Sequence, residues 1–313
     1  MRVLYCCLRQ ITFVLLVLLI NLQSNNVNAL DYTDAVGRVV HLPAPPQRIV
    51  SLVPSVTEIL YAIHAENQLV GVTDFCNYPP QAQQKISIGA YSDPGLETVA
   101  SLAPDLIIMD VASSSTALLY QFEQLAVPVY LVAPKSLTAT LETIVALGGV
   151  TGHQEVAMDL LNNLNDQIAE VVKMWSEKPL RTLVCVMIEP LVVAGAGTLA
   201  DDLINLAGGI NVAAELPRYP TLSMETVLLY DPDIIIVSPH PGTPAPADFF
   251  SNWPQLKAVR HKQVINVQAD LLQRPGPRLV AGLIMLRQCY NRLSTVKSVL
   301  ENGNCAIKQE ATH

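Results

Sequence analysis

Residues 96–109 read LETVASLAPDLIIM, and residues 224–237 read METVLLYDPDIIIV. The second stretch repeats the first after 128 residues, with Glu-Thr-Val, Pro-Asp and an apolar run in the same places. Each copy predicts a short helix that leads through Pro-Asp into a buried strand. Tyr91 and Tyr219 precede the two copies and are also 128 residues apart. Because one offset accounts for all these matches, the chain is expected to contain two duplicated α/β units.

Strands and helices alternate around both copies. Short apolar runs predict strands at 48–53, 69–73, 106–109 and 127–132, and then at 182–188, 234–237 and 264–267. Helical segments lie between these runs, which is typical of a mostly parallel sheet covered on both faces. We therefore expect an α/β fold made of two Rossmann-like lobes with mostly parallel sheets.

A long amphipathic helix is predicted between the two halves. Apolar residues recur at helical spacing from 153 to 177, and Pro179 ends the pattern. Such a helix can connect a first lobe over 48–152 to a second lobe over 179–303, with the helix itself over 153–178. A helix packed inside one large α/β domain is the alternative. We expect residues 30–47 to be a leader and residues 304–313 a tail.

The first residues predict export. Arg2 and Arg9 precede an apolar run over 11–20, and Val27-Asn28-Ala29 provides a cleavage site of small residues. This order is typical of a signal peptide over 1–29, cleaved after Ala29, which places the mature chain in the periplasm. The apolar run is about half the length that a transmembrane helix needs. A retained N-terminal anchor is the alternative.

The charge of the chain argues against a nucleic-acid partner. The net charge is −8, and removal of the signal peptide takes away two arginines and no acid, which leaves −10. Binding to nucleic acid depends largely on Lys and Arg that neutralise phosphates. An acidic chain of this kind is expected to bind neither DNA nor RNA.

Four cysteines remain after the signal peptide, namely Cys76, Cys185, Cys289 and Cys305. They form no C-x-x-C pair, so neither a metal cluster nor another cofactor is predicted. We interpret them as four isolated thiols. A disulfide between Cys289 and Cys305 is the alternative, since export permits it.

The sequence carries none of several common catalytic signatures. It lacks a G-x-S-x-G elbow, an H-E-x-x-H pair and a phosphate-binding G-x-x-x-x-G-K-[ST] loop. The chain is therefore expected to bind a ligand and not to be an enzyme. An enzyme on the same architecture stays the alternative, because a fold does not dictate a function.

Several segments match a known family in the family's own order along nearly the whole mature chain. The matching segments include Gln47-Arg48-Ile49-Val50-Ser51-Leu52, Pro54-Ser55-x-Thr57-Glu58, Tyr78-Pro79-Pro80-Gln81, Leu102-x-Pro104-Asp105, Leu206-Ala207-Gly208-Gly209 and Arg274-Pro275-Gly276-Pro277-Arg278. The chain thereby resembles the periplasmic binding proteins for cobalamin, ferric siderophores and haem, and within them most closely the cobalamin binders.

The resemblance implies a ligand held between two lobes by a monomer and delivered to an ABC permease of the inner membrane. Glu97 and Glu225 match positions that pair with permease arginines, and charge pairs of this kind give register and encounter rate. The alternative is that both glutamates only stabilise the N-termini of their helices.

The resemblance also implies a set of ligand-binding residues. Tyr91 and Tyr219 match aromatic positions that flank a corrin ring, while Asp270 and Arg274 match polar residues of the cleft. The further candidates, which follow predicted strands, are Ser55, Phe75 and His240. Cobalamin is the expected ligand. A ferric siderophore or haem is the alternative, because a tyrosine can also ligate haem iron.

Overall fold

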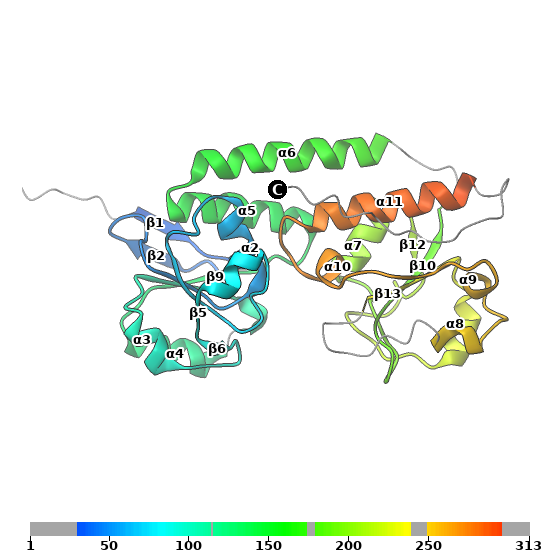
Figure 1. The fold of residues 1–313 in the computed structure, drawn as a ribbon, viewed down its shortest axis with the longest axis horizontal. Coiled ribbons are helices and arrows are strands. Elements are labelled where there is room, and N and C mark those ends of the chain that lie inside the picture. The colour runs from blue at the N-terminus through cyan, green and yellow to red at the C-terminus, as the bar shows by residue number, and fades with distance from the viewer. Residues whose placement is uncertain (1–29, 114, 174–178, 239–248, 296–313) are drawn as a thin grey trace, which may run out of the picture.

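The computed structural model describes residues 30–113, 115–173, 179–238 and 249–295 (Figure 1). The predicted signal peptide over 1–29 and the predicted tail over 304–313 lie outside these ranges, and both stay predictions. Among the described residues, no helix has both the length and the apolar character needed to cross a bilayer.

The first lobe is built on a parallel sheet with the strand order β5-β4-β3-β8-β9. These strands are β3 (Ile49–Ser51), β4 (Leu69–Val72), β5 (Ile86–Ser87), β8 (Leu106–Asp110) and β9 (Val129–Val132). The segments between them are α2 (Pro54–Ala62), η1 (Pro80–Gln84), the hairpin of β6 (Gly89–Ala90) and β7 (Asp93–Pro94), α3 (Leu96–Ser101), η2 (Val111–Ser113) and α4 (Thr116–Gln124). Because these strands all run in the same direction, their carboxyl ends lie at one edge of the sheet.

The second lobe repeats this plan with the strand order β11-β10-β13-β14, and β12 also pairs with β10. The strands are β10 (Arg181–Met187), β11 (Val192–Val193), β12 (Ile210–Asn211), β13 (Ile234–Val237) and β14 (Val264–Asn266). The helices are α7 (Leu199–Leu206), α8 (Met224–Tyr230), η3 (Phe249–Asn252), α9 (Lys257–Arg260) and α10 (Asp270–Gln273). Only β11 pairs antiparallel in the described part of this sheet.

Three helices run along the top of the molecule in Figure 1, where α5 lies over the first lobe and α11 over the second. They are α5 (Leu137–Thr151), α6 (Gln154–Lys173) and α11 (Leu279–Thr295), and α6 packs on both others. The approach of α5 to α6 requires a glycine, since a Cβ at Gly148 would lie 2.3 Å from the Cβ of Ala157. In Figure 1, α6 runs from above the first lobe toward the second.

The two lobes share an apolar core. One cluster of buried residues joins Ile49 and Ile108 of the first sheet, Val184 and Ile234 of the second, and Leu164 of α6. The opposite face of each sheet has a cluster of its own. Because protein interiors are close-packed, this shared core holds the lobes and the three helices in a defined mutual position.

The sequence repeat corresponds to a repeated set of hydrogen bonds. The Asp105 carboxylate accepts from the backbone N–H of Arg48 at 2.9 Å, and the Asp233 carboxylate accepts from that of Arg181 at 3.0 Å. In return, the backbone N–H groups of Asp105 and Asp233 donate to the carbonyls of the same two arginines, at 2.9 and 2.8 Å. Each Pro-Asp thus ties the start of β8 or β13 to the strand beside it.

The predicted α/β fold of two lobes with mostly parallel sheets is confirmed.

The structure contains elements that the sequence patterns did not predict. The segment expected to be a leader contains the antiparallel hairpin of β1 (Leu30–Thr33) and β2 (Val39–Leu42). Helix α5 is apolar on most faces, so its sequence lacks the polar stripe by which an amphipathic helix is recognised. The lobe boundaries stay predictions, and α6 begins at Gln154.

The cysteines differ from the expectation of four isolated thiols. Cys76 and Cys185 are free and buried, whereas Cys289 is disulfide-bonded, so the expectation is wrong for Cys289. Sequence spacing alone does not reveal which thiols approach each other. Cys305 lies outside the described residues, and its pairing with Cys289 stays a prediction.

Candidate functional site

Four of the predicted ligand-binding residues lie just after the carboxyl ends of strands. Ser55 follows β3, Phe75 follows β4, and Asp270 and Arg274 follow β14. Loops from the two lobes meet here, because Arg274 Nη1 donates to Asn77 Oδ1 at 2.9 Å. Open α/β sheets bind ligands at this edge.

Two aromatic side chains of the first lobe lie together at this edge. Phe75 is 55% exposed, and Tyr91, in the turn between β6 and β7, is 42% exposed. Their ring centroids are 6.2 Å apart and their planes are tilted by 60°. A backbone hydrogen bond of 3.0 Å from Asp74 to Gly89 holds the two loops together. The pair presents an apolar face that a large, half-polar ligand can cover.

Tyr219 is held by the corresponding region of the second lobe. Its loop pairs with the segment after β11, where the Gly195 N–H donates to the Arg218 carbonyl at 2.7 Å. Only a glycine fits there, since a Cβ at Gly195 would lie 2.1 Å from the Leu216 carbonyl oxygen. The Tyr219 side chain is 49% exposed, yet desolvation raises the pKa of its hydroxyl. Tyr219 is therefore a half-exposed aromatic residue of the second lobe, as Tyr91 is of the first.

Four charged side chains form an ion-pair cluster across the lobes, which we call the charge cluster: Glu58, Asp270, Arg274 and Arg278. Arg274 Nη1 lies 2.9 Å from Glu58 Oε1, and Arg274 Nη2 lies 3.0 Å from Asp270 Oδ1. Arg278 Nε lies 2.9 Å from Glu58 Oε2, and Arg278 Nη2 lies 3.0 Å from Asp270 Oδ2. Each arginine thus contacts both carboxylates.

Sequence reasoning missed Glu58 and Arg278 as site residues. Both belong to segments that match the family, but nothing in the sequence shows that α2 and the start of α11 meet. The Arg278 guanidinium also lies 3.8 Å from the centre of the Tyr78 ring, as a cation–π contact. Burial alone would lower the pKa of Arg278, but hydrogen bonds and charges of Glu58 and Asp270 raise it overall.

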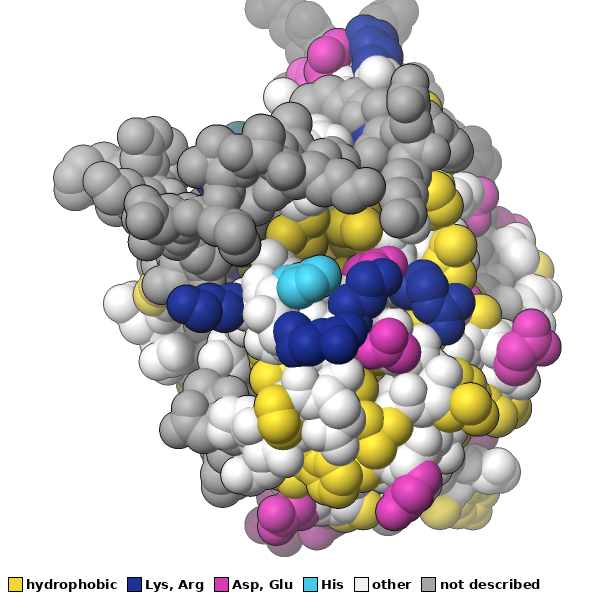
Figure 2. Space-filling view, turned by 90° about the vertical axis from the view of Figure 1, so that its right-hand side faces the viewer, with side chains coloured by type: hydrophobic (Ala, Val, Ile, Leu, Met, Phe, Trp, Pro, Cys, Tyr) yellow, Lys and Arg dark blue, Asp and Glu magenta, His cyan; other side chains and the backbone are white. Residues whose placement is uncertain are grey.

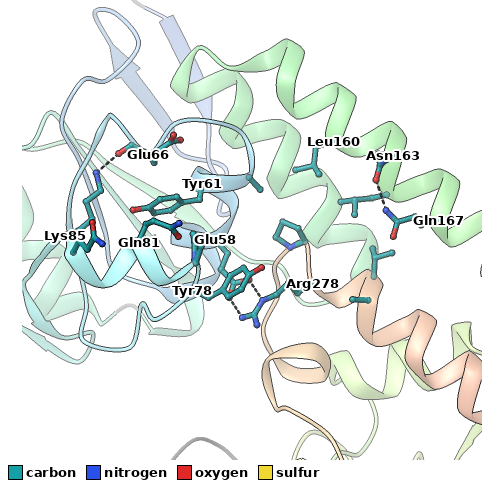
Figure 3. A pocket seen from close by; sticks show the side chains of 17 residues that line it. Glu58, Tyr61, Glu66, Tyr78, Gln81, Lys85, Leu160, Asn163, Gln167 and Arg278 are labelled. Carbon is teal, nitrogen blue, oxygen red and sulfur yellow. Dashed lines mark hydrogen bonds and ion pairs between the residues drawn. The ribbon is translucent and has the colours of Figure 1, made fainter. Parts of the chain in front are cut away.

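A cavity of about 1180 Å³ lies between α2, η1, α6 and the start of α11, beside Glu58 and Arg278 of the charge cluster (Figure 3). Glu58, Tyr78 and Arg278 line it, so the charge cluster forms part of its wall. Amide side chains make up much of the remaining polar lining, namely Gln81, Gln84, Asn163 and Gln167. Of the predicted ligand-binding residues that the structure describes, none is among the residues that line this cavity.

Two predicted ligand-binding residues stand apart from the others. Ser55 lies in the first turn of α2 and is only 4% exposed, so it offers little surface to a ligand. His240 lies outside the described residues.

The two predicted docking glutamates occupy equivalent places. Glu97 is exposed in the first turn of α3, and Glu225 is exposed in the first turn of α8. A hydrogen bond from the Ser223 side chain lowers the pKa of Glu225. Each helix follows the exposed tyrosine of its lobe, so a carboxylate and an aromatic ring recur together in both lobes.

Other positive charge gathers at the far end of the second lobe. Figure 2 shows a group of Lys and Arg side chains around a His on this end of the molecule. Here α9 and the turn after it carry Lys257, Arg260, His261 and Lys262. Within the described ranges, no group of three or more His, Cys, Asp or Glu is placed to hold a metal ion.

Comparison with known proteins gives a consistent match. Residues 49–271 match the family model described as periplasmic binding protein. The vitamin B12-binding protein of Vibrio cholerae serotype O1 is 31% identical over 240 residues, which cover 75% of this chain and 86% of that protein. An uncharacterized ABC transporter substrate-binding lipoprotein of Bacillus subtilis is 27% identical, over 83% of this chain and 85% of that protein.

Solved structures agree with the sequence match. The crystal structure of the periplasmic vitamin B12 binding protein BtuF of Vibrio cholerae superposes with a TM-score of 0.71 and 28% identity, over 80% of this chain and 99% of that chain. The periplasmic heme-binding protein RhuT of Roseiflexus sp. RS-1 gives a TM-score of 0.70 and 27% identity, again over 80% and 99%.

Proposed function

This chain belongs to the periplasmic binding protein family, whose members are solute-binding proteins and not enzymes, and we propose that it captures cobalamin or a related corrinoid between its lobes. The observation that carries the proposal is the meeting of strand-end loops from both lobes. Glu58 and Arg274 pair at 2.9 Å in this region, and Phe75 and Tyr91 lie exposed on two neighbouring loops. The similarity to two vitamin B12-binding proteins supports the choice of ligand.

The chemistry of cobalamin suits these side chains. A corrin ring offers two broad apolar faces, for which the half-exposed rings of Tyr91 and Tyr219 provide matching surfaces. Its rim carries amide groups, which can donate to Asp270 and accept from Arg274. Phe75 extends the Tyr91 surface, while His240 is proposed as a further contact and Ser55 as a minor one.

Delivery to a membrane permease is the second part of the proposal. In a periplasmic monomer, Glu97 and Glu225 would pair with basic side chains of an inner-membrane ABC permease. Their exposure and their equivalent positions in α3 and α8 support this role, as does the similarity to the Bacillus subtilis substrate-binding lipoprotein. Two such contacts, one on each lobe, would orient the protein on its partner and speed their encounter.

Haem is the second candidate ligand, because the chain is similar to a heme-binding protein and because tyrosine can ligate haem iron. Ligation by tyrosine requires loss of the hydroxyl proton. Desolvation raises the pKa of Tyr219 and so opposes this step. The 31% identity to the vitamin B12-binding protein of Vibrio cholerae supports cobalamin as the first candidate.

Isothermal titration calorimetry with cyanocobalamin tests the proposal. The mature chain is expected to bind one cobalamin per protein with a dissociation constant of about 1 μM or lower, which corresponds to about −8 kcal/mol. Haem, titrated in parallel, should bind more weakly. Binding of haem with no binding of cobalamin would move the assignment to the second candidate.

A further inference from the structure

The charge cluster contains its own neutralising charges. Its two carboxylates and two guanidinium groups give a formal charge of zero, and every guanidinium contacts both carboxylates at 3.0 Å or less. Arg274 Nη1 is also hydrogen-bonded to Asn77 Oδ1. The positive charge of both arginines is therefore already matched by the two carboxylates, so a second anion would find no excess positive charge here.

Glu58 is the most deeply buried member of this cluster. Its side chain is 2% exposed, compared with 14% for Arg274, 18% for Arg278 and 19% for Asp270. The backbone at Gly276 closes over it, since a Cβ there would lie 3.1 Å from Glu58 Oε2. Glu58 is thus almost fully buried against both arginines, which are themselves somewhat more exposed.

This arrangement makes anion binding at the arginines costly. A ligand carboxylate at Arg274 or Arg278 would bring a third negative charge beside two positive ones, and it would compete with Glu58 and Asp270 for both arginines. A buried carboxylate that loses its partner is strongly destabilising, because its desolvation is no longer compensated. An uncharged amide needs no such exchange, since it can use the remaining exposed edges of Asp270 and Arg274.

We infer that Glu58 is a positioning residue that sets the ligand class, because it neutralises Arg274 and Arg278 and so makes the site select a ligand without net negative charge. This inference rests on the proposed function and deepens it. Anionic ligands, such as the propionates of haem or a polyanionic iron chelate, are then rejected because they leave the carboxylates of Glu58 and Asp270 without a matching positive charge. Selectivity of this kind arises from the cost imposed on the wrong ligand.

The test compares ligands of one shape and different charge. Cyanocobalamin is titrated beside a cobalamin with two side-chain amides hydrolysed to carboxylates, into the wild type, Glu58→Gln and Glu58→Asp. The wild type should prefer the amide form by about tenfold or more in Kd, which is about 1.4 kcal/mol. Glu58→Gln should reduce this preference about tenfold, since it leaves one positive charge uncompensated, and Glu58→Asp should restore part of it.

Glu123→Gln is the matched control, because Glu123 is exposed near the end of α4 and its substitution changes the net charge equally. If the Glu58→Gln and Glu123→Gln variants prefer the amide form over the hydrolysed form by the same ratio of Kd values, the inference is overturned. Where circular dichroism shows that Glu58→Gln does not fold, Arg278→Gln replaces it. That variant removes a positive charge and should increase the wild-type preference, whereas an unchanged or smaller preference contradicts the inference.

The ligand assignment can fail separately. A wild type that binds no corrinoid contradicts the proposed function. Haem and its uncharged dimethyl ester then serve as the ligand pair, with the same expected effects of Glu58→Gln and the same control. If Glu58→Gln and Glu123→Gln change the ratio of the Kd values for haem and its dimethyl ester equally, the inferred role of Glu58 is overturned as well.

Discussion

Glu58 Oε1 lies 2.9 Å from Arg274 Nη1, although the two residues are 216 positions apart and follow strands of different sheets. This contact joins the strand-end loops of the two lobes at the place where open α/β sheets bind ligands. It also brings a buried carboxylate beside the arginine that the sequence predicted as a cleft residue. The proposed ligand-binding region therefore includes the contact between the lobes.

The exposed tyrosines are expected to contribute directly to ligand affinity. Tyr91→Ala or Tyr219→Ala should weaken cobalamin binding by about 1 kcal/mol, roughly fivefold in Kd, because each removes an aromatic face. Titration calorimetry measures the change. Tyr120→Ala is the control, since Tyr120 is 60% exposed on α4, outside the strand-end loops. Equal effects of all three substitutions would contradict the assignment.

The paired glutamates are expected to act in transport and not in capture. A Glu97→Ala, Glu225→Ala double variant should bind cobalamin as the wild type does, while uptake through the permease falls by about tenfold or more. Uptake of labelled cobalamin by cells measures this loss. Glu123→Ala combined with Glu142→Ala removes two exposed acids elsewhere and should leave uptake unchanged. Normal uptake by the Glu97, Glu225 variant would exclude the docking role.

The two Pro-Asp aspartates should contribute similarly to stability. Asp105→Ala and Asp233→Ala each remove a carboxylate that accepts a backbone hydrogen bond at a strand start, and each should cost about 1–2 kcal/mol. The sites are in different lobes, so the two costs should add within about 0.5 kcal/mol. Urea unfolding of the single and double variants measures them. If only one of the two substitutions lowers the free energy of unfolding, the two aspartates do not have equivalent structural roles.

Asp110, at the end of β8, is expected to destabilise the fold when it is charged. Burial raises its pKa above 3.8, although the Ala112 backbone hydrogen bond and Lys135 oppose the shift. Folding therefore favours the protonated form of Asp110. The protonated carboxyl contributes fully to the stability of the fold below about pH 3.8, and this contribution is lost as the pH rises through the folded-state pKa.

Asp110→Asn should consequently be no more stable than the wild type below this pH, and more stable at pH 7 by about 0.5–1 kcal/mol. Thermal unfolding from pH 3 to pH 8 measures the difference between the two proteins. Asp159→Asn, on an exposed position of α6, is the control for the loss of one carboxylate. A wild type that is the more stable protein at pH 7 would reverse the sign and contradict the account.

The repeat predicted the fold because it records equivalent contacts. Asp105 and Asp233 are 128 residues apart, and each closes the same backbone hydrogen bonds in its lobe. The sequence pattern did not reveal α5, because Leu137, Leu141, Ile144 and other apolar residues face packed surroundings on several sides. A helix buried in this way has no polar face to mark its period.

The candidate site could be predicted only in part, for a related reason. Asp270 and Arg274 follow a predicted strand, so their place at its carboxyl end follows from topology. Glu58 lies inside α2, and its role depends on α2 meeting the loop before α11, a contact across 216 residues. Local sequence patterns do not encode such a contact, and the three-dimensional packing of the lobes was needed to identify it.

The absorbance spectrum of the mature protein after exposure to an equimolar mixture of cobalamin, haem and a ferric hydroxamate, followed by desalting, tests the central claim most directly. The account predicts a retained corrinoid spectrum with one cobalamin per chain, and loss of that spectrum in a Tyr91→Ala, Tyr219→Ala variant. Retention of haem or of the iron chelate, with no cobalamin, would contradict it.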